Sequence, residues 1–257
     1  FLDVAASGGA ERRVPEGTES ALLAEVEADH ETAASEKARA LAEIFRGAGA
    51  TVVRVALDAT AETELWELRH AASPILARLD PNLRSMQFIE DTAVPPERLA
   101  DYVRGVRRIL DAHETRGVIF GHAGDAHVHV NPLVDVGRAG WRDRVASILD
   151  EITTLTASLG GTLTGEHGDG RLRTPLLPRV WPAGALANFA EAKRAFDPHG
   201  VLNPGVKVAI AGEQPLGVIK YDPALEPLPP RAAAALDRIE RDRAYASFRL
   251  ELLDAVP

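Results

Sequence analysis

Two short runs containing glycine carry half of the chain's histidines. The first is residues 121–129 (GHAGDAHVH) and the second is residues 165–171 (GEHGDGR). Together they hold four of the eight His, one Glu and two Asp. Imidazole and carboxylate suit zinc, manganese or ferrous iron as ligands, and imidazole also transfers protons near neutral pH. The runs therefore predict one site that binds a metal, transfers protons or does both, and the fold must bring them together.

The composition excludes several classes of protein and site. The chain contains no Cys, so disulfides and thiolate metal sites are excluded, and any metal must use nitrogen and oxygen ligands. The net charge is −9 with both signs mixed along the chain, so it offers no basic stripe for nucleic acid. No apolar stretch approaches the ~20 residues of a membrane span. The 257 residues suffice for one large domain or two small ones.

The beginning of the sequence also carries an expectation. It has no initiator Met and no basic segment followed by a long apolar run. We therefore expect a soluble fragment of a longer polypeptide. The expected location is the cytoplasm, with peripheral membrane association through partner proteins as the alternative.

Hydrophobic periodicity predicts an α+β fold. Apolar residues at helical spacing predict helices at 31–49, 63–79, 97–113, 141–159, 185–196 and 231–253. Strand-like segments occur at 21–28, 51–57, 86–94, 117–120 and 127–133. This order favours a ferredoxin-like mixed or antiparallel sheet covered by helices on one side, followed by a C-terminal helical and loop-rich segment. A proline-rich loop is expected at 175–182.

Changes in composition divide the chain into three expected parts. These are a lead-in at 1–20, a main domain at 21–211, and a proline-rich linker with a peripheral helix at 212–257.

The three His of the first run can converge if a turn precedes a strand. Residues two apart on a strand share a face, so His127 and His129 should project together. The turn between them and His122 can fold that imidazole back towards His129. Asp125 could then fix the tautomer of a ligating His. The alternative is a cluster of His that only satisfies backbone groups.

The second run reads as a glycine-rich loop that presents Glu166 and His167. Glycine permits backbone angles that a Cβ would forbid. Adjacent side chains point in different directions, so one can bind a metal while the other faces a substrate. The alternative is a surface turn stabilised by Asp169, whose carboxylate accepts hydrogen bonds from its own backbone.

With a third run at 196–207 (FDPHGVLNPGVK), these two runs resemble the C-terminal cap region of FAD-linked oxidases. This group of the vanillyl-alcohol oxidase superfamily includes the glycolate oxidase D-subunit, D-lactate dehydrogenase and D-2-hydroxyglutarate dehydrogenase. The resemblance covers roughly residues 20 to 208, and the order of three motifs is highly specific.

The resemblance implies a metal site, a base and a flavin. It implies that His122, His129 and Glu166 bind a divalent Zn, Mn or Fe ion, and that His167 contacts the substrate and is the base. It also implies FAD, bound mainly by an N-terminal domain of the same polypeptide. No glycine-rich segment for the flavin pyrophosphate precedes Ala21, so we expect that this chain does not hold FAD alone. An electron-acceptor protein or an iron–sulfur domain is a further implied partner.

The resemblance also implies substrate contacts. Residues 65–69 (LWELR) match a family segment whose Arg binds the substrate carboxylate, which corresponds to Arg69, with a solvated helix charge as the alternative. Ser73 stands where some members have Thr, and Arg84 is a substitute for a following Lys.

His127 and Asn203 complete the implied site. His127 stands where many members have an Asn that contacts substrate, so it is expected to contact substrate or to add a metal ligand. Asn203 is implied as a cofactor contact.

The expected function is the substrate- and metal-binding domain of a flavin-dependent D-2-hydroxy-acid dehydrogenase of the D-lactate, glycolate or 2-hydroxyglutarate type. The alternatives are a metal-dependent hydrolase and a non-catalytic metal-binding module.

Overall fold

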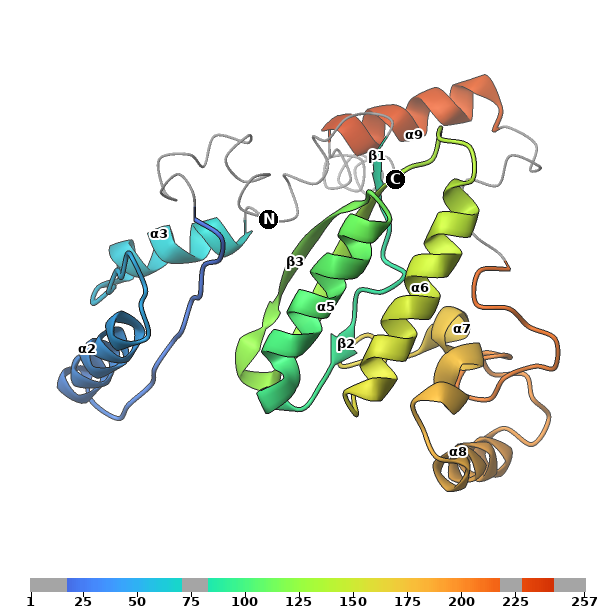
Figure 1. Ribbon diagram of the computed structural model, residues 1–257, viewed down its shortest axis with the longest axis horizontal. Coiled ribbons are helices and arrows are strands. Elements are labelled where there is room, and N and C mark those ends of the chain that lie inside the picture. Colours follow the sequence, from blue (N-terminus) through green and yellow to red (C-terminus); the bar gives the residue numbers. More distant parts are fainter. Residues whose placement is uncertain (1–17, 71–82, 218–227, 243–257) are drawn as a thin grey trace, which may run out of the picture. The chain divides into compact units, whose positions relative to one another are not determined.

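The computed structural model describes residues 18–70, 83–217 and 228–242 (Figure 1). Both His-rich runs lie in the second of two compact units. These units are Phe1–Leu79 together with Ala234–Pro257, and Asp80–Ala233. The domain boundaries expected after residues 20 and 211 stay predictions.

The described residues of the first unit include two helices that precede the second unit in the chain. Helix α2 spans Glu31–Gly47, as its periodicity predicts, and α3 spans Ala59–His70. Asp58 begins α3 by accepting hydrogen bonds from the backbone N–H groups of Thr60 and Ala61, at 3.0 and 2.9 Å. Such a cap satisfies donors that have no partner within the helix.

The prediction of strands at 21–28 and 51–57 was wrong, because neither segment forms a strand in the structure. Side chains such as Leu22 and Val52 are 67% and 52% exposed. An apolar segment becomes a strand only where a partner supplies backbone hydrogen bonds and a second layer covers its apolar face. The part of the expected helix beyond residue 70, which includes Ser73, lies outside the described residues.

The second unit is built on a small antiparallel sheet with β4 at its centre. Strand β4 spans His127–Asp135 and pairs along one edge with β3, Arg116–His122. Its other edge pairs with two short strands, β1 (Leu83–Ser85) and β2 (Thr92–Ala93). The two strands expected on either side of the turn in the first run are therefore confirmed. The ferredoxin-like topology stays a prediction.

Two helices, α5 (Leu99–Ala112) and α6 (Trp141–Ser158), pack side by side over one face of this sheet (Figure 1). Each turns an apolar stripe towards Val128 and Val130 of β4, and both helices agree with the sequence prediction. Gly160, at φ +71°, follows the end of α6 in a left-handed conformation that suits glycine. The fully buried residues of this core include Tyr102, Val106, Val130, Val145, Ile148 and Ile152.

The strand expected at 86–94 is interrupted, so that prediction was only partly right. The chain bends at residues 88–89, between β1 and β2. Phe88 and Ile89 are buried in the core, whereas Glu90 and Asp91 are buried among polar groups. In a continuous strand one of the two adjacent carboxylates would face the apolar core, where burying an unpaired charge is costly. The bend directs both carboxylates to hydrogen-bond donors instead.

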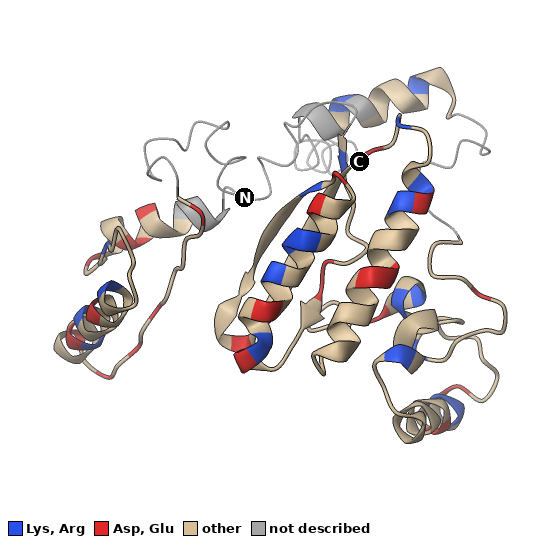
Figure 2. Ribbon diagram, viewed as in Figure 1, with Lys and Arg blue, Asp and Glu red and all other residues tan. Residues whose placement is uncertain are grey.

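The remaining elements are shorter or peripheral. Helix α8 confirms the helix expected at 185–196, whereas the loop expected at 175–182 is largely a 3-10 helix, η4. Basic and acidic side chains occur together along α2, α5 and α6 (Figure 2). None of the described helices combines the length and apolarity needed to cross a membrane. The bounds are η2 (Pro96–Arg98), η3 (Ala123–Asp125), α7 (Gly170–Arg173), η4 (Thr174–Arg179), α8 (Ala183–Phe196) and α9 (Pro230–Asp242).

Gly121 lies where β3 passes close to the backbone of β4. A Cβ at this position would lie 2.2 Å from the carbonyl oxygen of His127 and 2.9 Å from Cα of Val128. We expect Gly121→Ala to reduce the free energy of unfolding by roughly 1–3 kcal/mol, the usual cost of overpacking. Urea unfolding measures the change. Gly124→Ala is the matched control in the same hairpin, because its Cβ would meet nothing within 4 Å; equal losses in the two variants would contradict the prediction.

Candidate functional site

The hairpin of β3 and β4 brings the three His of the first run together. The turn at Ala123–Asp125 places His122 directly opposite His127 in the strand register. Along β4, His127 and His129 share one face, with ring centroids 4.5 Å apart. The ring of His122 lies 5.7 Å from both of the others, centroid to centroid. The predicted convergence of these three imidazoles is therefore confirmed.

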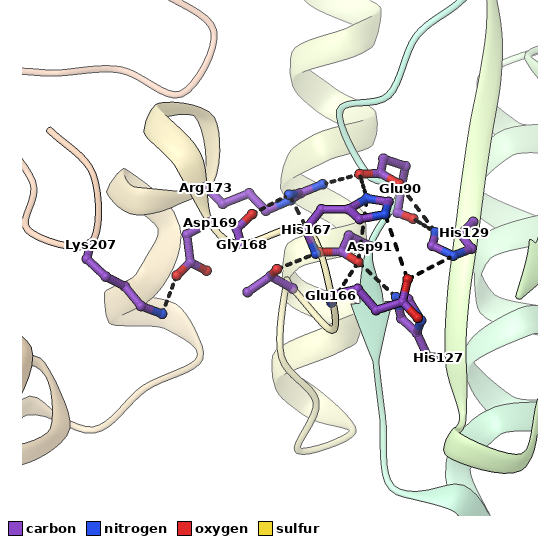
Figure 3. A network of polar contacts seen from close by, with 11 residues as sticks. Glu90, Asp91, His127, His129, Glu166, His167, Gly168, Asp169, Arg173 and Lys207 are labelled. Carbon is purple, nitrogen blue, oxygen red and sulfur yellow. Dashed lines mark hydrogen bonds and ion pairs between the residues drawn. The ribbon is translucent and has the colours of Figure 1, made fainter. Parts of the chain in front are cut away.

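The loop of the second run carries Glu166 to the same place (Figure 3). One carboxylate oxygen of Glu166 lies 3.3 Å from Nε2 of His122 and 3.5 Å from Nδ1 of His127. Its other oxygen lies 3.7 Å from Nε2 of His129. Three imidazole nitrogens of the first run thus face one carboxylate, and Nε2 of His167 lies 3.7 Å from the same group.

Hydrogen bonds on the far side of two rings select the nitrogens that face Glu166. Nδ1 of His129 lies 2.9 Å from the carbonyl oxygen of Glu90 and must donate its proton there, because a carbonyl only accepts. Nε2 of His127 lies 2.8 Å from Oδ1 of Asp91. The other nitrogen of each ring therefore presents a lone pair towards Glu166.

Asp91 links the two runs. Besides His127, its buried carboxylate accepts hydrogen bonds from the Thr164 hydroxyl and from the backbone N–H groups of Glu166 and His167, at 3.1 and 3.0 Å for the last two. Burial opposes ionisation of Asp91, but these hydrogen bonds outweigh it and lower the pKa to about 2. The same ionised group thus orients one imidazole and fixes the backbone of the second run.

Glu90 makes a second connection, to His167. Its Oε1 lies 2.8 Å from Nδ1 of His167 and 3.1 Å from a guanidinium nitrogen of Arg173. The hydrogen bond and charge of Glu90 raise the pKa of His167 above its ordinary value. The His167 side chain is 52% exposed, and its Nε2 lies 3.7 Å from a carboxylate oxygen of Glu166, beyond hydrogen-bond distance, so a small molecule can reach this nitrogen.

The donor set fits a divalent metal ion. His122, His127, His129 and Glu166 each offer a ligand atom, and these atoms lie within 4.8 Å of one another. Two ligand atoms on one ion, with bonds of about 2.1 Å, are about 3.0 Å apart at a right angle and about 3.4 Å apart at a tetrahedral angle. The distances of 3.3–3.7 Å between the Glu166 oxygens and the three imidazole nitrogens are close to this range. Lone pairs that face a carboxylate repel it unless a cation lies between them.

The other site residues predicted from the sequence lie away from this cluster, or their side chains are outside the described part of the structure. Arg69 belongs to α3 in the other unit, and nothing is described of its side chain or of Ser73. Arg84 pairs with Val134, five residues along β4 from His129, roughly 17 Å at strand spacing. Asn203 lies exposed in the turn after α8 at φ +44°. Their expected roles stay predictions.

The orienting carboxylates are Glu90 and Asp91, which the sequence analysis missed. Asp125, to which that role was given, is exposed, and no described hydrogen bond or ion pair joins its side chain to a His. The sequence did contain a signal for them: an adjacent Glu-Asp pair inside the apolar segment 86–94. Carboxylates are rarely buried unless they are paired, so two of them in an apolar segment indicate nearby partners. Asn131 was also missed: it follows His127 and His129 on the same face of β4, and its buried Oδ1 has no described hydrogen-bond partner.

Comparisons with known proteins agree with the sequence resemblance. Residues 2–206 match the family model described as FAD linked oxidases, C-terminal domain. D-2-hydroxyglutarate dehydrogenase of Pantoea ananatis is 38% identical over 141 residues, which is 55% of this chain and 14% of the relative. Glycolate oxidase subunit GlcD of Escherichia coli K12 is 30% identical over 194 residues, 76% of this chain and 38% of the relative.

D-lactate dehydrogenase of Archaeoglobus fulgidus is 34% identical over 115 residues, 45% of this chain and 25% of the relative. The chain therefore spans between 14% and 38% of the length of these three relatives.

We expect Asp91→Asn to destabilise the second unit, because an amide cannot accept all the hydrogen bonds that the carboxylate accepts. An unsatisfied buried donor costs roughly 1–3 kcal/mol. Chemical unfolding of the metal-free protein at neutral pH measures this loss, and Asp125→Asn, which removes an exposed carboxylate from the first run, is the control.

The loss should also depend on pH. The pKa of Asp91 is lowered from 3.8 to about 2 on folding, so its contribution is complete above pH 3.8 and disappears as the pH falls through 2. A difference between wild type and Asp91→Asn that persisted undiminished at pH 2 would contradict this assignment.

Proposed function

Because the chain belongs to the family of FAD linked oxidases defined by their C-terminal domain, we propose that it is the substrate- and metal-binding part of a flavin-dependent dehydrogenase of D-2-hydroxy acids. The names of its relatives include three 2-hydroxy acids: 2-hydroxyglutarate, glycolate and lactate. The proposal therefore names a class of substrate, with a carboxylate next to a hydroxyl-bearing carbon, and not one acid.

One observation carries the proposal: Glu166 faces the nitrogens of three imidazoles, two of which have their tautomers set by Glu90 and Asp91. A site assembled only to satisfy backbone groups has no need of lone pairs directed at a carboxylate. Of the family-implied ligands, His122, His129 and Glu166 all belong to this cluster. They would hold the ion.

Burial divides the cluster into an inner and an outer side. The side chains of His127 and His129 are only 4% and 6% exposed, whereas those of His122, Glu166 and His167 are about half exposed. A small substrate can therefore approach from the outer side. The buried imidazoles form the inner side, where hydrogen bonds to Asp91 and Glu90 hold them in place.

His167 is the proposed base, at Nε2. Its Nδ1 donates to Glu90, which leaves a lone pair on Nε2 to accept the proton of the substrate hydroxyl. Arg173 donates to Glu90 and to the carbonyl oxygen of Gly168, so it holds both the orienting carboxylate and the loop. A divalent metal, when bound, supplies a Lewis acid that polarises the substrate oxygen. FAD, when bound, supplies the two-electron acceptor.

Further parts of the proposal rest on the resemblance. Arg69, Ser73 and Arg84 would bind the substrate carboxylate, and Asn203 would contact the cofactor. An N-terminal domain of the same polypeptide would bind most of the FAD, and an electron-acceptor protein or iron–sulfur domain would take the electrons. Cytoplasmic location, with or without membrane association through partners, belongs to the same proposal.

Removal of metal tests the centre. We expect treatment of the purified full-length protein with a chelator to abolish oxidation of D-2-hydroxy acids with an artificial acceptor, and addition of Zn²⁺, Mn²⁺ or Fe²⁺ to restore it. The metal content is measured in parallel. Full activity of the metal-free protein would refute the metal centre, and flavin-independent hydrolysis by the loaded protein would favour the hydrolase.

His167→Gln tests the base. Gln keeps the size and polarity of the side chain but cannot accept the proton, so turnover should fall by ~10²–10⁴-fold, the range for loss of a general base. Metal content should stay at the wild-type level. If metal content falls while turnover per bound metal stays normal, His167 is a ligand and not a base.

A further inference from the structure

His127 has a polar partner at each ring nitrogen, although the family resemblance places a substrate contact at this position. Nε2 is 2.8 Å from Oδ1 of Asp91, and Nδ1 is 3.5 Å from Oε1 of Glu166. The first contact meets hydrogen-bond geometry and the second does not. The two nitrogens therefore have different roles.

The contact with Asp91 decides which nitrogen carries the proton. Asp91 is ionised and can only accept, so Nε2 of His127 donates and Nδ1 keeps its lone pair. A carboxylate that fixes an imidazole in this way is the usual support of a metal-bound His. Asp91 also holds the backbone N–H of Glu166, so the group that orients this imidazole anchors the residue that faces it.

Gly165 gives an independent indication that the loop is fitted to this imidazole. A Cβ on Gly165 would lie 2.5 Å from Cδ2 and 2.8 Å from Nε2 of His127. Only a residue without a side chain lets the loop approach so closely. This approach brings the Glu166 carboxylate over Nδ1.

A direct substrate contact by His127 conflicts with the geometry. A substrate can reach its Nδ1 only by displacing Glu166, because the side chain is 4% exposed and Glu166 covers that nitrogen.

We propose that His127 is a fourth protein ligand of the metal centre, bound through Nδ1, and that Asp91 is the positioning residue that prepares it. This inference rests on the metal centre of the proposed function. The centre then has three imidazoles and one carboxylate, from His122, His127, His129 and Glu166.

A fourth protein ligand affects the choice of metal. A D-2-hydroxy acid that binds through its carboxylate and its hydroxyl needs two positions, which together with four protein ligands makes six. Zinc sites that bind substrate usually use three protein ligands and remain four- or five-coordinate. The proposed ligand set therefore favours a six-coordinate ion such as Mn²⁺ or Fe²⁺ over Zn²⁺.

Competition with a chelator tests the fourth ligand without reference to activity. We expect His127→Asn to bind Mn²⁺ at least ~10-fold more weakly than wild type, since even residues that only support a ligand change affinity by about 10–100-fold. His113→Asn is the matched control. His113 also contacts a carboxylate, with Nε2 2.7 Å from Glu151, but belongs to no metal cluster among the described residues.

The outcomes separate this inference from the proposed function. Equal Mn²⁺ affinities for wild type and His127→Asn would overturn the fourth ligand and leave the metal centre intact. Failure of wild type to bind any divalent metal would overturn both.

A measurement on wild type covers the case in which His127→Asn fails to fold. In a crystal loaded with Mn²⁺, the anomalous-difference peak should lie roughly 2.0–2.4 Å from Nδ1 of His127, since Mn²⁺ is slightly larger than Zn²⁺, whose bonds to His nitrogen are about 2.0–2.1 Å. A peak bound by His122, His129 and Glu166 but more than about 3 Å from that nitrogen would overturn the proposal.

Discussion

Two adjacent buried carboxylates, Glu90 and Asp91, hold the site together. The Asp91 carboxylate accepts hydrogen bonds from His127 on β4 and from the backbone of the second run, while the Glu90 carboxylate contacts His129, His167 and Arg173. Buried charges are tolerated only when they are paired or fully hydrogen-bonded. Since these partners come from three separate segments, satisfying the two carboxylates requires those segments to meet in one arrangement.

The sheet makes this arrangement rigid by giving β4 two different faces. Val128 and Val130 pack into the core under α5 and α6, and His127 and His129 lie on the opposite face. A shift of the strand register by one residue would turn the histidines towards the core and the valines towards the site. The free energy gained by burying the valines therefore also fixes where the imidazoles project.

The chemical asymmetry of the site follows from this packing. The buried carboxylates and imidazoles form its inner side, whereas Glu166 and His167 reach it from a loop and remain half exposed. Although adjacent in sequence, these two residues have different main partners: Glu166 faces the three imidazoles of the first run, whereas His167 hydrogen-bonds Glu90 through Nδ1 and lies 3.7 Å from Glu166 through Nε2. A single loop can thus contribute both a ligand and a proton acceptor.

The sequence by itself determined the chemistry of the two runs, the helices α2, α5, α6 and α8, and the hairpin that brings His122 to His127. These features depend on local periodicity and turn residues, which can be read along the chain. Tertiary structure decided the rest: the segments at 21–28 and 51–57 formed no strand, and the apolar segment 86–94 bent to bury Glu90 and Asp91 against the site. It also turned Nδ1 of His127 towards Glu166, because the choice between two ring nitrogens depends on a carboxylate 36 residues away in the sequence. Pairing partners and buried charges are non-local, so a single sequence read by periodicity does not reveal them.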